Sequence, residues 1–204
     1  MALKNHLLDG QITKTAFVEF MKFGFRKASI RNIAYRAGVT AGAVYTRYTG
    51  KDALFCSLLE NILAEFEKQG SVAIQRYNIA EQTACLEDFL TAMRCEVQIY
   101  SDIFFNYYDE CVLLFCKSDG SSANNWLEAM IEHKLTTTVS FFKKIAGGPV
   151  NKDVIRLLLD ANLHIYRKLL NFSLTKDEGI ACIIEVQDFL EAGWIKLFKQ
   201  LQNI

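Results

Sequence analysis

Small residues between positions 29 and 51 form a pattern that suits close contact with another molecule. Thr40 can cap a short helix, and the next three residues, Ala41, Gly42 and Ala43, carry almost no side-chain bulk. A glycine inside a helix costs about 1 kcal/mol relative to alanine. Close approach of the helix backbone to base edges in a DNA groove is a physical reason to accept that cost. These residues are therefore predicted to face bases.

Polar and charged side chains flank this bare stretch. Tyr45, Thr46 and Arg47 can direct hydroxyl groups and a guanidinium toward phosphates or bases. Arg31, which precedes residues 41–43, is a candidate for a bidentate hydrogen-bond contact with guanine. The spacing thus predicts direct contacts with DNA from two neighbouring short helices.

Two predicted helix starts, at Ser29 and at Lys51, offer free backbone N–H groups that favour a phosphate. The charge of the segment agrees with this interpretation. Residues 1–51 contain nine Lys and Arg against Asp9 and Glu19, a net charge of +7, and the remaining residues have a net charge of −7. A basic head on an acidic body indicates an anionic partner for the head.

Apolar residues recur at helical spacing along most of the chain, and the only proline is Pro149. This pattern predicts an all-α protein of about nine helices. A three-helix helix-turn-helix domain is expected in residues 1–51, with Gly38 in its turn, and a helical bundle in residues 52–204. The predicted helices span residues 5–24, 29–36, 40–47, 51–69, 82–100, 101–117, 126–145, 151–174 and 176–201, and the clearest loop spans 118–125.

The two closing helices, 151–174 and 176–201, are apolar over more than one face. A helix at the edge of a bundle needs only one apolar stripe, so the excess favours a four-helix seam between two copies of the chain. The alternative is that both helices lie inside the monomer. A dimer would place two recognition helices about 34–36 Å apart, one turn of DNA.

The sequence offers no pattern typical of catalysis or metal binding. The three histidines share no ligand spacing, the six cysteines form no CxxC pair, and no Ser/His/Asp arrangement stands out. We therefore predict no enzyme activity, no metal and no cofactor. The N-terminus lacks a continuous apolar core and no apolar run reaches the roughly 18 residues of a membrane span. A cytoplasmic protein with free thiols and no membrane partner is expected.

The segment ASIRNIAYRAGVTAGAVYTRY, followed by KDALF, resembles the N-terminal domain of TetR-family transcriptional regulators. The resemblance covers about residues 10–56. It implies that Tyr45 and Lys51 contact phosphates, that residues 41–43 face bases, and that Arg31 reads a base. Many members carry a basic or polar residue at the position of Ala41 and often a histidine at that of Arg47. Direct readout would therefore depend on Arg31, Tyr45 and Arg47.

The resemblance further implies a homodimeric, ligand-responsive regulator that binds a near-palindromic operator on double-stranded DNA, most often as a repressor. The segment 99–110 has more aromatic rings than one helix face can bury, which suits a pocket or an interface. An apolar or aromatic effector is expected in the body. Its candidate contacts are Phe89, Met93, Phe104, Tyr107, Tyr108, Trp126, Met130, His133 and Tyr166. The alternative is a DNA-binding adaptor whose body binds a protein partner instead of a small ligand.

Overall fold

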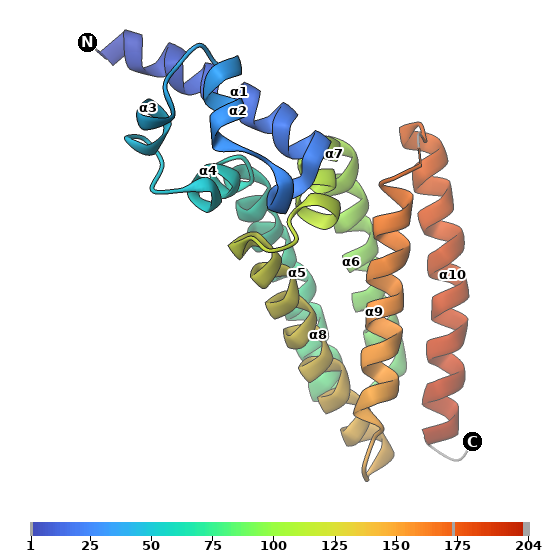
Figure 1. Ribbon diagram of the computed structural model, residues 1–204. Coiled ribbons are helices and arrows are strands. Elements are labelled where there is room, and N and C mark those ends of the chain that lie inside the picture. Colours follow the sequence, from blue (N-terminus) through green and yellow to red (C-terminus); the bar gives the residue numbers. More distant parts are fainter. Residues whose placement is uncertain (1, 173, 202–204) are drawn as a thin grey trace. The chain divides into compact units, whose positions relative to one another are not determined.

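A computed structural model describes residues 2–172 and 174–201 (Figure 1). Within these residues, all the regular secondary structure is helical. This confirms the predicted all-α class. The described residues form ten α-helices and one short π-helix. They are α1 (Ala2–Lys27), α2 (Ile30–Arg36), α3 (Ala41–Tyr45), α4 (Lys51–Ser57), α5 (Glu60–Thr83), α6 (Leu86–Asn106), α7 (Tyr108–Val112), the π-helix η1 (Leu113–Lys117), α8 (Ser122–Ala146), α9 (Lys152–Leu169) and α10 (Lys176–Leu201).

The predicted caps define the two short helices of the head. The Ser29 side chain accepts a hydrogen bond from the backbone N–H of Asn32 at the start of α2. Thr40 does the same for Ala43 at the start of α3, over 3.1 Å. Gly38, between the two helices, has a φ of 68°, a conformation that favours glycine. The turn chemistry anticipated from the sequence is therefore present.

The single helix predicted over residues 51–69 is two helices, α4 and α5. The backbone N–H groups of Leu58 and Leu59 donate to the carbonyls three residues earlier, on Phe55 and Cys56. Bonds of this kind tighten the last turn and redirect the chain without glycine or proline. The prediction missed this break because its residues carry no turn signal.

The helix predicted over residues 101–117 is also wrong. Helix α6 continues to Asn106, and Tyr107 then leaves the helical conformation with φ −129° and ψ 44°. The short α7 and η1 follow, and α8 begins at Ser122, inside the predicted loop. The predicted helix over 176–201 coincides with α10, whereas α9 ends at Leu169, before the predicted end at residue 174.

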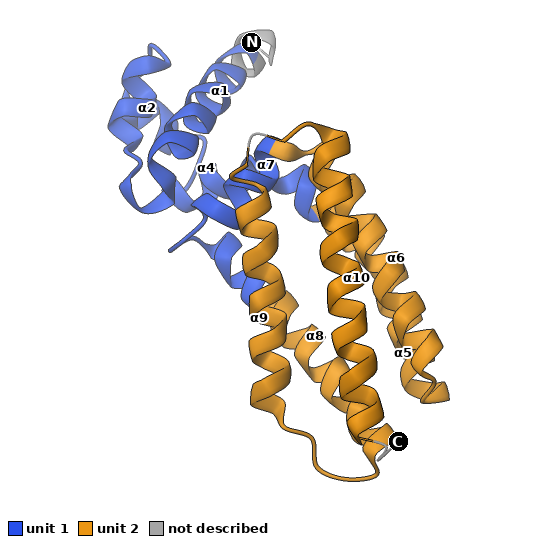
Figure 2. Ribbon diagram, turned by 90° about the vertical axis from the view of Figure 1, so that its right-hand side faces the viewer, with its two compact units in different colours: residues 1–63, 109–128 blue, residues 64–108, 129–204 orange. Residues whose placement is uncertain are grey.

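The chain divides into two compact units (Figure 2). The first comprises residues 1–63 and 109–128, and the second comprises residues 64–108 and 129–204. The segment 109–128 is attached to the first unit through polar side chains: Arg26 pairs with Asp119 at 3.0 Å, and Asp52 accepts hydrogen bonds from Ser122. The first compact unit extends beyond residue 51. A functional domain boundary at residue 51 stays a prediction.

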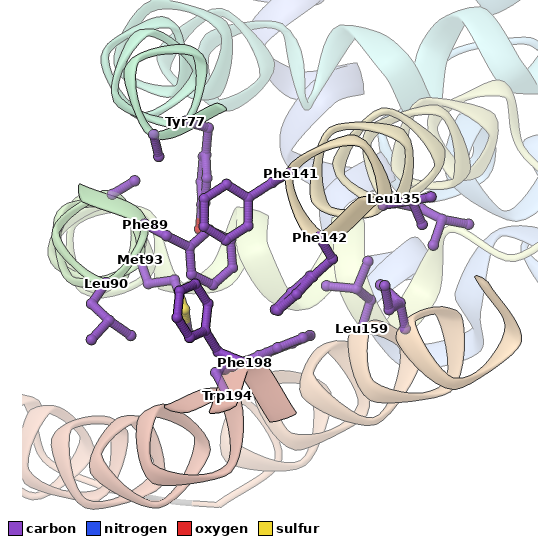
Figure 3. Packing of buried hydrophobic residues seen from close by; sticks show 14 residues of the cluster. Tyr77, Phe89, Leu90, Met93, Leu135, Phe141, Phe142, Leu159, Trp194 and Phe198 are labelled. Atoms are coloured by element: carbon purple, nitrogen blue, oxygen red, sulfur yellow. The ribbon is translucent and has the colours of Figure 1, made fainter. Parts of the chain in front are cut away.

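Each unit has its own aromatic core. In the first, the ring of Phe20 meets that of Phe55 edge to face, with centroids 4.9 Å apart. In the second, Phe89 of α6 stacks on Phe141 of α8 at 4.4 Å, and Phe142 stacks on Trp194 of α10 at 5.7 Å (Figure 3). Because these rings are almost completely buried, each contributes strongly to the stability of its unit.

Candidate nucleic-acid interface and ligand cavity

Helix α3 presents a nearly bare outer face. Val44 is 1% exposed and anchors the helix to its own unit, whereas Tyr45 is 55% exposed. A Cβ atom built on Gly42 would meet only the hydroxyl of Thr40, at 3.8 Å. Nothing in the fold of the monomer therefore requires glycine at this position. The absence of a side chain at residue 42 leaves the backbone accessible to an approaching molecule.

Helix α2 adds an exposed face of its own. Ile30, Ile33 and Ala34 are its buried residues, so Arg31 and Tyr35 lie together on the opposite side, four residues apart. Tyr35 is 86% exposed, which no packing requirement explains. The sequence prediction included Arg31 but missed Tyr35. The helical spacing of the buried residues was the signal that could have identified it.

Arg47, which the sequence predicts to contact DNA, makes hydrogen bonds within the first unit. Its Nε donates to Asp9 of α1 over 2.6 Å, and a second guanidinium nitrogen donates to the carbonyl of Ala43. Asp9 and Arg47 are partly shielded from solvent, so this ion pair ties α3 to α1. The structure thus gives Arg47 a role in positioning α3, and a contact with DNA would require this pair to open.

Lys51 also makes contacts within the first unit. Its ammonium donates to the carbonyls of Arg26 and Ala28, at 3.1 and 3.4 Å, and lies 4.6 Å from the ring centroid of Phe25. These contacts stabilise the end of α1, where carbonyl groups lack helical partners. A phosphate near the start of α4 would compete with these carbonyls for the same ammonium.

The start of α2, proposed as a second phosphate position, already has an acidic partner. Glu19 is 1% exposed, and its carboxylate accepts hydrogen bonds from the backbone N–H of Ser29 and the side-chain amide of Asn32. A carboxylate at a helix N-terminus interacts favourably with the helix dipole. Because Glu19 occupies this position, Ser29 acts here as a cap and anchor. Glu19 was not among the predicted site residues.

The second unit contains a small polar cavity of about 40 Å³. Two residues of the predicted ligand set, Met93 and Tyr166, line it. The other lining residues are Glu96, Val97, Tyr100, Lys134, Asn162 and Gln187. The pocket expected from the sequence was apolar or aromatic, whereas a carboxylate, an ammonium and two amides surround this one. Periodicity could not reveal it, because its polar residues come from four helices.

The remaining predicted ligand residues have other positions. Phe89 belongs to the packed aromatic core, and Phe104 meets Tyr166 edge to face at 5.3 Å. Tyr108 donates its hydroxyl hydrogen bond to the carbonyl of Leu170. Tyr107 follows the end of α6, and Trp126 belongs to the first compact unit. The sulfur of Met130 accepts a long hydrogen bond from Tyr100, and His133 is exposed.

Within the described residues, no three His, Cys, Asp or Glu side chains are grouped so that they could hold a metal ion. All six cysteines are free thiols, and burial raises the pKa of the Cys111 thiol well above its usual range. The helices of the described part are all too short or too polar to cross a bilayer.

Short capped helices with an outward-facing α3, joined to a helical body, define a helix-turn-helix DNA-binding protein. Residues 12–58 match the family described as "Bacterial regulatory proteins, tetR family". Residues 12–58 therefore form a TetR-type helix-turn-helix domain, which is a DNA-binding domain. No curated protein sequence matches the chain.

Two solved structures share the fold over most of their length. One is a TetR-like transcriptional regulator from Rhodococcus sp. RHA1, with a TM-score of 0.53 and 14% sequence identity, aligned over 91% of this chain and 96% of that chain. The other is the transcriptional regulator FadR from Bacillus subtilis in complex with stearoyl-CoA, with a TM-score of 0.51 and 13% identity over 90% and 97%. At these identities the similarity establishes the fold alone.

Proposed function

We propose that this protein is a homodimeric, ligand-responsive repressor that binds a near-palindromic operator in the cytoplasm. The observation that carries the proposal is the outer face of α3. Gly42 is exposed, its missing side chain has no packing reason, and the buried Val44 holds the helix from behind. A helix of this form can approach base edges in the major groove closely.

The flanking side chains supply the remaining contacts. Tyr45 and Tyr35 are exposed aromatic residues with hydroxyl groups that can bond phosphates, and Arg31 is exposed on α2, four residues before Tyr35. Lys51 would exchange its carbonyl partners for a phosphate when DNA binds. Arg47 would remain with Asp9 and keep α3 oriented.

The closing helices support a dimer. Leu157 of α9 is 68% exposed, and Ile184 and Phe189 of α10 are 53% and 79% exposed. Apolar residues exposed together on two long helices are expected to be covered in an assembly. A protein partner covering the same residues is the second candidate, and it would make the body an adaptor.

Effector binding in the second unit would reach the head along the chain. Helix α6, which contributes four cavity residues, leads directly into segment 109–128 of the first unit. That segment is bonded to α1 and α4 through Asp119 and Ser122. FadR, which shares the fold, was solved with stearoyl-CoA, and by analogy we propose that this body also takes a small ligand.

Replacing Gly42 by alanine tests the DNA-binding face. The substitution should stabilise α3 by about 1 kcal/mol, because alanine is the better helix former. It should nevertheless weaken binding to an operator selected from random DNA by tenfold or more, measured by fluorescence anisotropy. The matched control is Gly70→Ala on α5, where an added Cβ meets nothing within 4 Å. Equal operator affinity for Gly42→Ala and the parent would contradict the proposal.

Ile184→Glu tests the dimer. This residue is 53% exposed on α10, and a charge there should turn the dimer into a monomer in sedimentation velocity at micromolar concentration. Ile79→Glu on α5, where the isoleucine is 52% exposed, is the matched control and should leave the dimer intact. A monomeric parent protein would favour the adaptor.

A further inference from the structure

A buried carboxylate lines the polar cavity. Glu96 of α6 is 6% exposed and accepts a 2.8 Å hydrogen bond from the hydroxyl of Tyr77 on α5. Tyr100 and Tyr166 also line the cavity. Burial, and secondarily the nearby Glu96 carboxylate, raises the pKa of both tyrosines, so their hydroxyls stay protonated at neutral pH. Among the described residues, the Glu96 carboxylate is therefore the one acidic group that lines the cavity, and two neutral tyrosines lie beside it.

The ammonium of Lys134, on α8, lies beside this carboxylate. It pairs with Glu96 and lies 5.6 Å from the ring centroid of Tyr77. The Lys134 side chain is 27% exposed, whereas that of Glu96 is 8% exposed. A lysine with one end at the surface can move its ammonium into water, but the glutamate cannot. The Lys134 ammonium can therefore leave Glu96 and make room for the cation of a ligand.

Two further polar groups of the cavity have no hydrogen-bond partner. They are the side-chain oxygen of Asn162 on α9 and the side-chain nitrogen of Gln187 on α10. Gln187 is 7% exposed, so water outside the protein does not satisfy its amide. Buried polar groups without partners are rare and costly in native structures. Together they provide one acceptor and one donor beside the Glu96–Lys134 pair.

We propose that the effector of this protein is a small primary amine with an oxygen close to the amino group. Its ammonium replaces that of Lys134 beside Glu96, between the rings of Tyr77 and Tyr100. The side-chain oxygen of Asn162 accepts a second hydrogen bond from the ammonium, and the amide nitrogen of Gln187 donates to the ligand oxygen. This inference rests on the proposed ligand response and names the chemistry of its site.

The charge and the size of the cavity favour an amine over other ligands. Once Lys134 withdraws, the remaining fixed charge is the Glu96 carboxylate, which repels an anion and attracts a cation, and aromatic rings strengthen that attraction. A volume of about 40 Å³ has room for a few water-sized groups. A long acyl chain does not fit in that volume, so the ligand class differs from the stearoyl-CoA seen with FadR.

Isothermal titration calorimetry with the full-length chain tests the site directly. Ethanolammonium chloride is the probe, sodium glycolate is its anionic counterpart and ethylene glycol its neutral one. We expect only ethanolammonium to bind the parent protein. Lys134→Met removes the internal competitor and should bind ethanolammonium at least tenfold more tightly. Glu96→Gln should lose binding at least tenfold, and its circular dichroism spectrum verifies that it is folded.

If Glu96→Gln does not fold, the affinity of Lys134→Met for ethanolammonium tests the proposed amine site. Binding of glycolate instead, abolished by Lys134→Met, would overturn the proposal in favour of an anion. Binding of none of the three probes, in parent and variant alike, would also overturn it.

Release of operator DNA is measured separately, by anisotropy, with sodium chloride at equal ionic strength as the control. We expect ethanolammonium to release the DNA. If ethanolammonium binds but does not release the DNA, the effector role is wrong and the amine site is still supported. If the protein binds DNA but no amine, the amine site is wrong and the proposed regulatory function is still supported.

Discussion

The second unit contains two aromatic regions built from the same helices, and they differ in what fills the space between the rings. Around Phe89, Phe141 and Trp194 the rings meet one another directly and the region is closely packed (Figure 3). Around Glu96 and Tyr166, two turns or more along the same helices, charges and amides lie among the rings of Tyr100 and Tyr166, and a cavity remains. Close packing resists rearrangement, whereas a polar cavity with a movable lysine can exchange partners.

The largest effect is expected in the packed region. Phe141→Ala should lower the free energy of unfolding by about 4 kcal/mol, because a fully buried ring leaves a cavity that the stacked Phe89 can fill only partly. Urea denaturation measures the loss. Phe172→Ala, at a residue that is 54% exposed, is the control and should change stability by less than about 0.5 kcal/mol. Equal losses in the two variants would remove the contrast between the regions.

Breaking the ion pair between Lys134 and the buried Glu96 should have the next largest effect. Lys134→Met leaves the Glu96 carboxylate buried without its cation and should cost about 3 kcal/mol in urea denaturation. The double variant Glu96→Leu with Lys134→Met should recover most of this loss, since it removes both charges. The exposed pair of Lys152 and Glu132 provides the control, and Lys152→Met should cost less than about 1 kcal/mol. A double variant as unstable as Lys134→Met alone would show that the pair does not act through its charge.

Removing an unpartnered amide should stabilise the cavity region. Gln187→Leu replaces the buried side-chain nitrogen by methyl groups and should raise the free energy of unfolding by about 1 kcal/mol. Ethanolammonium binding should weaken in the same variant. Gln75→Leu, on the exposed side of α5, should change neither property. Destabilisation by Gln187→Leu would mean that the amide already has a partner, such as a bound water.

The smallest effect at neutral pH is expected for Tyr166→Phe. Burial, and secondarily the Glu96 carboxylate, raises the pKa of the Tyr166 hydroxyl above that of an unfolded tyrosine, about 10. The unfolded chain therefore loses this proton first. The stability that Tyr166 contributes is complete below about pH 10 and is lost as pH rises toward the folded pKa. Urea midpoints between pH 8 and 11 should fall less steeply for Tyr166→Phe than for the parent, and identical slopes would contradict this.

Local signals predicted most of the head. Ser29, Thr40 and Gly38 act within a few residues of their own positions, as caps and a turn, and the structure confirms all three. The contacts of Arg47 and Lys51 were not predictable in the same way. Their partners, Asp9 and the carbonyl of Arg26, lie 38 and 25 residues away, and no periodic pattern records such distances.

The body was predicted less completely, for physical reasons. The break between α4 and α5 and the turn at Ala84, with φ 51°, occur without glycine or proline. In the cavity, the predicted ligand set included Met93 and Tyr166 but missed Glu96, because a buried carboxylate looks like a surface residue in the sequence. Only the packing of four helices shows that this glutamate lies inside.

Segment 109–128 has a consequence for anyone who cuts or recombines this chain. It lies 45 residues beyond the end of the first stretch of its unit, so that unit is assembled from two separate pieces of the gene. A fragment ending at residue 63 would lack the partners of Arg26 and Asp52. A transplant of this DNA-reading module onto a foreign sensor must therefore carry both pieces, and a simple splice after the fourth helix should yield a truncated, unstable product.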